Sequence, residues 1–161
     1  MALDIATNLG FCMGPEVGKA PRFGTLELPG VHSDDLIDRS EVAIYDWLFP
    51  VVRMVGAKIV VIEAPFIHPQ RDEHNNAAAF FLVGAARVAG RKAGAKVVLQ
   101  RVQTVRACFI GNGNLKRDEA KALVFSRCVQ LGWAPKNHDE ADAGALWYWA
   151  MATTYPKWNP K

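Results

Sequence analysis

The sequence has 161 residues, half of them hydrophobic, which is enough for one globular domain with a full core over residues 1–161. Its formal net charge of +3 permits a nucleic-acid partner without requiring one. The three scattered cysteines form no C-x-x-C pair, and there is no signal peptide or membrane-length apolar run. We therefore expect reduced thiols, no zinc site, no membrane partner and a soluble, cytoplasmic protein.

The first part of the chain predicts a three-stranded antiparallel meander. Residues 1–5 mix apolar side chains with one acid, and residues 7–10 indicate a short bend. Residues 11–14 resume a strand, residues 14–19 have the composition of a turn, and residues 23–28 alternate as a half-buried strand does.

A long helix and a buried strand are expected next. Ser33 and Asp34 are helix-start signals, and residues 35–55 carry one apolar face, formed by Leu36, Ile37, Ile44, Leu48 and Val52. Pro50 lies inside this stretch, so we expect it to kink or divide the helix. Residues 58–63 are a continuous β-branched run, which is typical of a strand buried on both faces of a sheet.

Helices and strands alternate in the second half. Residues 67–76 are polar and predict a loop or frayed helix start, and the helix at 77–93 contains a Gly84 that indicates close packing. We then expect a buried strand at 96–102, a short helix at 104–109, a turn at 111–114, and helices at 116–131 and 139–154. This order predicts an α/β fold whose five-stranded mixed sheet, three antiparallel strands and then parallel ones, is flanked by helices on both faces.

Carboxylates stand at one end of three of these elements. Asp4 lies in the first strand, Glu63 ends the buried strand, and Asp139 and Asp142 open the last helix. A carboxylate in an apolar strand is costly unless it is paired, protonated or bound to a cation, although a surface strand could instead turn Asp4 to water. Taken alone, Asp139 also fits a helix N-cap and Asp142 a favourable helix-dipole position, but neither explains the other two acids. The joint pattern indicates a metal site.

This order of elements and acids resembles the RuvC family of Holliday junction resolvases, within the RNase H-like (retroviral integrase) superfamily, over nearly the whole chain. Members of that family begin with an Asp followed by a small-residue turn and a Gly, end the fourth strand with a Glu and an aromatic residue three positions later, and close with D-x-x-D-A. They also carry a Gly-x-Gly segment followed by basic residues. The matching residues here are Asp4, Gly10, Glu63, Phe66, residues 139–143, Gly111, Gly113, Lys116 and Arg117, whereas the family's Pro-Gly after the first Asp is Ile5-Ala6.

The resemblance implies that Asp4, Glu63, Asp139 and Asp142 are the catalytic and metal-binding residues. His138 is the other candidate for the third position, and we prefer Asp139 because it shares a helix face with Asp142. Four converging acids cannot all stay ionised without cations, and Mg²⁺ is held by carboxylates, phosphate and water. We therefore expect two Mg²⁺ ions roughly 4 Å apart, replaceable by Mn²⁺, which stabilise the attacking and leaving oxygens of an in-line displacement at phosphorus. Asp4 would bridge both ions.

Six residues are expected to hold the DNA, mostly through its phosphates. Phe66 would stack on or wedge between bases of an opened junction, with a core plug as the alternative. The set is Phe66, Arg71, Asn75, Asn76, Lys116 and Arg117.

The resemblance implies that the protein is a crossover junction endodeoxyribonuclease. The length of the chain suits a phage or bacterial resolvase. The alternatives are a broader nickase of flaps, forks, single strands or RNA–DNA hybrids, and a catalytically silent DNA-binding relative. Paired nicks imply a homodimer, with the helix at 77–93 at the interface. The helix at 77–93 has apolar side chains on more than one face, so one strip remains when the other packs on the sheet. The alternative to a dimer is that the final helix covers this remaining strip within one chain.

Overall fold

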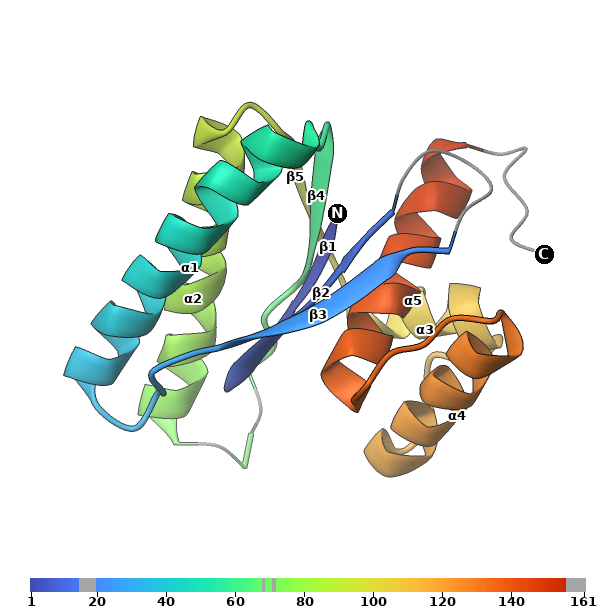
Figure 1. The fold of residues 1–161 in the computed structure, drawn as a ribbon. Coiled ribbons are helices and arrows are strands. Elements are labelled where there is room, and N and C mark those ends of the chain that lie inside the picture. Colours follow the sequence, from blue (N-terminus) through green and yellow to red (C-terminus); the bar gives the residue numbers. More distant parts are fainter. Residues whose placement is uncertain (15–19, 68, 71, 156–161) are drawn as a thin grey trace.

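The computed structural model describes residues 1–14, 20–67, 69–70 and 72–155, and a five-stranded sheet in the order β3-β2-β1-β4-β5 forms its centre (Figure 1). The central strand β1 (Ala2–Ile5) pairs antiparallel with β2 (Asn8–Met13), which pairs antiparallel with β3 (Arg22–Glu27). On its other side β1 pairs parallel with β4 (Ile59–Glu63), which pairs parallel with β5 (Lys96–Gln100). The predicted meander and mixed sheet are confirmed.

Two strand predictions are wrong in detail. Residues 8–10 are not a bend but the start of β2, because their backbone groups pair with β1 on one side and β3 on the other. The strand at residues 96–100 is not buried on both faces, because it forms the edge of the sheet and leaves Leu99 36% exposed. The predicted turn at residues 14–19 falls almost wholly outside the described residues.

Helices α1 (Asp34–Val55) and α2 (Glu73–Lys92) pack side by side on one face of the sheet (Figure 1). The side chain of Ser33 caps α1 as predicted, and Asp72 caps α2, so the polar stretch before residue 77 ends in a helical turn. Pro50 does not divide α1, because Leu48 and Val52 on either side of it are both held in the core. Gly84 is not closely packed against the part of the chain that the structure describes, since a Cβ there would meet none of it within 4 Å.

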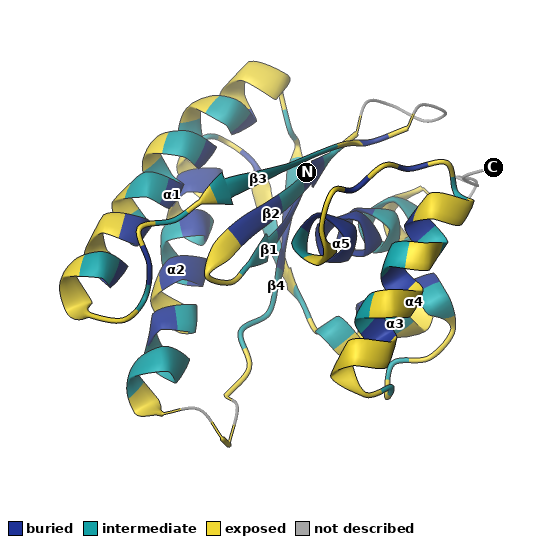
Figure 2. Ribbon diagram, turned by 60° about the horizontal axis from the view of Figure 1, so that its bottom comes forward, coloured by how far each residue is buried: buried dark blue, intermediate teal, exposed yellow. Residues whose placement is uncertain are grey.

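The other face carries α3 (Val102–Ile110), α4 (Arg117–Gln130) and α5 (His138–Thr154). Figure 2 shows α5 largely buried between the strands and the outer pair α3 and α4. The last helix begins at His138, one residue before its predicted start at residue 139. Within the described ranges, no helix combines the length and apolar character needed to span a membrane.

Two separate clusters fill the two faces. The cluster under α1 and α2 is largely aliphatic, with Leu3, Leu9, Ile44, Leu48 and Ile62 among its fully buried members. The cluster under α5 combines small residues with aromatic rings: Trp133 stacks on Phe109 and meets Trp147 edge-on. The three cysteines are free thiols, as expected.

Candidate active site

Parallel pairing of β1 with β4 brings Asp4 and Glu63 together. The register pairs Leu3 with Ile62, so Asp4 and Glu63 are the next residues along the two strands. Successive side chains of a strand point to opposite faces, and Leu3 and Ile62 belong to the core under α1 and α2. Both acids therefore stand at the carboxyl ends of their strands, on the face that α5 covers.

The first turns of α5 supply the other two acids. Asn137 caps the helix by accepting a hydrogen bond from the Glu140 backbone nitrogen at 2.8 Å, so the N-cap interpretation of Asp139 is wrong. The Asp142 side chain is 9% exposed and that of Asp139 is 27% exposed. Gly10, which lies opposite Asp4 in the sheet, lets this end of α5 approach, because a Cβ at Gly10 would collide with the Asp139 backbone carbonyl.

A buried glutamate fixes the start of α5 against the sheet. Glu140 accepts hydrogen bonds from the Thr25 hydroxyl at 3.1 Å and from the Lys136 backbone nitrogen at 2.7 Å. The Asn137 amide in turn donates to the same hydroxyl at 3.0 Å. Glu140 therefore has a structural role that its sequence neighbours, the two aspartates, do not share.

Charge interactions link the four acids. Burial, followed by the charges of Glu63, Asp142 and Asp139, raises the pKa of Asp4 well above its usual value. Burial and then the charge of Asp142 raise the pKa of Glu63 to about 7. Burial also raises the pKa of Asp142, to which the Asp139 charge adds. Ionising all of these acids together in the fold is therefore costly.

Two basic residues at the site were not among those predicted from the sequence. Lys121 Nζ in α4 lies 3.5 Å from Asp139 Oδ1, to which it donates a hydrogen bond, and 3.9 Å from Asp142 Oδ2. The Arg106 guanidinium in α3 lowers the pKa of both Glu63 and Asp142, and its Nε is buried with no hydrogen-bond partner among the described residues. The sequence held a signal for both, because residues three apart lie on the same face of a helix. Lys121 shares a face with Val124 and Arg106 shares one with Phe109, and both of these apolar residues are buried.

The donor chemistry of the cluster fits a hard divalent cation. Carboxylate oxygens are the ligands that Mg²⁺ takes, and a cation would offset the burial and the mutual repulsion that raise these pKa values. As the side chains stand, the described residues contain no group of three or more His, Cys, Asp or Glu that could hold a metal ion. Lys121 instead contacts the two aspartates of α5.

His138 lies beside the cluster but is exposed. Its ring packs edge-on against Phe125, with 5.6 Å between ring centroids, and its charge lowers the pKa of Asp142. Asp139, by contrast, raises the pKa of both Asp4 and Asp142.

The residues predicted to hold DNA fall into three groups. Phe66, three residues after Glu63, is 63% exposed, so the core-plug alternative is wrong. Lys116 and Arg117 are exposed at the start of α4. Asn75 and Asn76 are half-buried in the first turn of α2, where the Asn75 amide donates to Asp72 at 2.8 Å. Arg71 lies outside the described residues.

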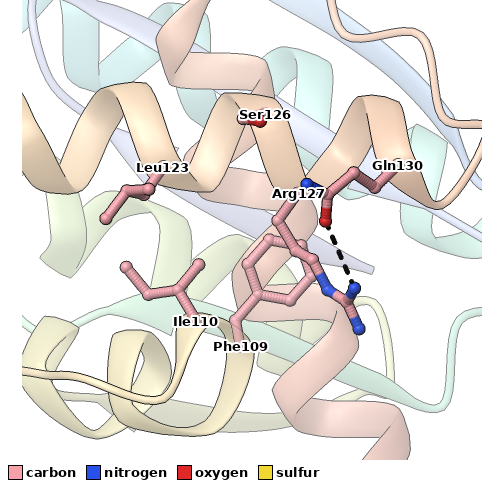
Figure 3. A pocket seen from close by; sticks show the side chains of 6 residues that line it. All are labelled: Phe109, Ile110, Leu123, Ser126, Arg127 and Gln130. Carbon is pink, nitrogen blue, oxygen red and sulfur yellow. Dashed lines mark hydrogen bonds between the residues drawn. The ribbon is translucent and has the colours of Figure 1, made fainter.

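A hollow of about 360 Å³ between α3 and α4 is separate from the acids (Figure 3). Three apolar and three polar residues line it, and on the α4 side Arg127 donates to Gln130 at 3.4 Å. The lining residues are Phe109, Ile110, Leu123, Ser126, Arg127 and Gln130, none of which belongs to the acidic cluster.

Comparison with known proteins identifies the fold. No protein-family model matches the sequence, and no curated protein matches it significantly. A structure of Thermus thermophilus RuvC is similar with a TM-score of 0.70 and 20% sequence identity, over 99% of this chain and 97% of that one. A structure of T. thermophilus RuvC in complex with a Holliday junction substrate is similar with a TM-score of 0.69 and 21% identity, over 94% of each chain. The RuvC-like fold expected from the sequence is confirmed.

Proposed function

We propose that this protein is a metal-dependent endonuclease that cuts branched DNA, and that it resolves four-way junctions as a homodimer. The observation that carries the proposal is the meeting of four carboxylates, from β1, β4 and α5, on one edge of a RuvC-like fold. The similar T. thermophilus protein bound to a Holliday junction substrate supports the choice of substrate.

The chain's own residues would divide the work at a phosphodiester. Asp4, Glu63, Asp139 and Asp142 would hold Mg²⁺ or Mn²⁺, which when bound polarises the phosphate and promotes attack by water. The strands fix the first two acids, and the cap of α5 fixes the other two. The half-buried Arg106, whose charge acts on Glu63 and Asp142, would donate hydrogen bonds to the scissile phosphate. Its positive charge would offset the charge that develops there.

DNA would approach along the exposed surface next to the acids. Lys116 and Arg117 would bind phosphates without reading sequence, as basic residues near a helix start commonly do. The exposed Phe66 ring is suited to stack on a base that leaves the duplex at a branch point. Asn75, whose amide donates to Asp72 in the cap of α2, and Asn76 beside it are the remaining candidates for DNA contacts.

A homodimer would supply the second active site that paired nicks require. Phe80, Phe81 and Val88 on α2 are 45%, 52% and 51% exposed and form an apolar strip. The final helix does not cover this strip, because α5 packs on the opposite face of the sheet (Figure 1). A partner's α2 is therefore the proposed cover, and the open space around Gly84 would admit it closely.

A cleavage panel tests the function. The protein is incubated in Mg²⁺ with an end-labelled four-way junction, a fork, a flap, a linear duplex and an RNA–DNA hybrid. The proposal predicts paired nicks in the junction and little cutting of the linear duplex. Preferred cutting of flaps or hybrids would indicate a broader nickase, and binding without any cutting would indicate a silent relative.

A further inference from the structure

Lys121 forms ion pairs with two acids of the cluster, and these pairs are largely removed from solvent. Its ammonium group lies within 4.0 Å of both α5 aspartates, at 3.5 Å from Asp139 Oδ1 and 3.9 Å from Asp142 Oδ2. Its side chain is only 22% exposed, and Asp142 is 9% exposed. Ion pairs that are this far removed from water are screened much less than exposed ones.

The charge balance of the cluster makes this contact consequential. Charge interactions link the four carboxylates, which come from three elements, and two basic side chains, Lys121 and Arg106, act on them. Of these two, only Lys121 is in ion-pair contact with the acids. The carboxylates that Lys121 contacts are two of the four that the proposed function assigns to a divalent cation.

We propose that Lys121 is a positioning residue that serves as a built-in counter-ion, holding Asp139 and Asp142 in the metal-free protein and competing with the divalent cation for them. This inference rests on the metal site of the proposed function. The ammonium group and a divalent cation are both positive and seek the same oxygens, so each weakens the binding of the other. Lys121 thereby keeps the free enzyme folded at low metal concentration and sets the concentration at which the site fills.

The decisive substitution is Lys121→Met, which keeps the length of the side chain but removes its charge. Without DNA, we expect this variant to bind Mn²⁺ on the order of tenfold more tightly than wild type, because a repelling charge and a competitor are both lost. We also expect its melting temperature without metal to fall and to recover when Mn²⁺ is added. Mn²⁺ binding is read from the electron paramagnetic resonance signal of the free ion, and melting from circular dichroism.

Two controls separate this role from a general charge effect. Lys121→Arg keeps the charge and should restore wild-type Mn²⁺ affinity and metal-free stability. Lys96→Met makes the same charge change at an exposed residue that pairs with Ile59, at the opposite end of the strands from Glu63. It should leave the Mn²⁺ affinity unchanged.

The outcomes decide the inference independently of nuclease activity. Unchanged or weaker Mn²⁺ binding by Lys121→Met would overturn the counter-ion role, even if the wild type resolves junctions. Tighter binding would support it even if no branched DNA is cut, in which case only the proposed function fails. If Lys121→Met does not fold, Lys121→Gln replaces it, with the same two expectations and the same overturning result.

Discussion

The two faces of the sheet are built from the same strands but have different chemistry. The face under α1 and α2 is an aliphatic core, and the face under α5 combines small and aromatic residues with four acids and two basic side chains. In β1 and β4 this difference arises between adjacent residues: Leu3 and Ile62 turn to the first face, and Asp4 and Glu63 turn to the second. In each strand, a residue that stabilises the core is thus directly followed by a residue of the candidate active site.

This separation implies that the stabilising face anchors the site without touching it. The carboxylates at the ends of β1 and β4 are costly to ionise together, as the raised pKa of Glu63, about 7, and that of Asp4 indicate. The neighbouring aliphatic side chains hold the strands in register and offset that cost. Substitutions on the two faces should therefore affect different properties.

The largest contrast is expected between the adjacent residues Asp4 and Leu3. Asp4→Asn should reduce junction cleavage by about 1,000-fold or more while leaving junction binding intact or improved, since one ligand and one repelling charge are removed. Leu3→Ala should instead lower the free energy of unfolding by about 2–5 kcal/mol, because Leu3 is fully buried. Gel-based cleavage and binding assays and chemical denaturation measure these effects. Near wild-type cleavage by Asp4→Asn would contradict the catalytic role of Asp4 and thus the contrast between the two faces.

The second contrast concerns exposed apolar side chains on opposite faces. Phe81 in the α2 strip is 52% exposed, and Leu123 in α4 is 44% exposed. If α2 forms the dimer interface, Phe81→Arg should raise the dimer dissociation constant by about 30-fold or more, whereas Leu123→Arg should not change it. Sedimentation equilibrium at micromolar concentration measures both. A wild-type protein that stays monomeric, free and bound to a junction, would refute the dimer and favour a nickase.

The third contrast is the response of each face to metal. Saturating Mg²⁺ or Mn²⁺, at about 100 times its dissociation constant, should stabilise wild type by about 2.7 kcal/mol. Glu63→Gln removes one oxygen ligand and should show a smaller shift, whereas Ile62→Val, next to it on the aliphatic face, should shift as wild type does. Thermal unfolding with and without metal gives these values. Equal shifts in wild type and Glu63→Gln would count against a ligand role for Glu63.

The smallest expected effect is that of Phe66. Because its side chain is 63% exposed, Phe66→Ala should change the free energy of unfolding by no more than about 0.5 kcal/mol. If the ring stacks on an unpaired base, cutting of intact junctions should fall about tenfold, and cutting of pre-opened junctions much less. Ile67→Ala, at the same 63% exposure, is the matched control. An equal loss of cutting on intact and pre-opened junctions would contradict the proposed stacking of Phe66 on an unpaired base.

The sequence predicted the order of elements well, because periodicity is a local signal, and it predicted which strands and which helix carry the four acids. It missed features that depend on distant neighbours. Residues 8–10 look like a turn until pairing on both sides makes them a strand, and residues 96–100 look buried until the strand order places them at the edge. Lys121 and Arg106 lie on helix faces that the pattern marks as inward, but the pattern does not say which partners they meet there.

The most direct test of the central claim is to locate a bound cation. Crystals of the wild-type protein grown in Mn²⁺ would be measured for anomalous scattering, which identifies the ion and its ligands. The account predicts a peak bonded to carboxylate oxygens of Asp4, Glu63 and at least one of the two α5 aspartates. A protein that is saturated with Mn²⁺ but shows no peak among these four acids would contradict it.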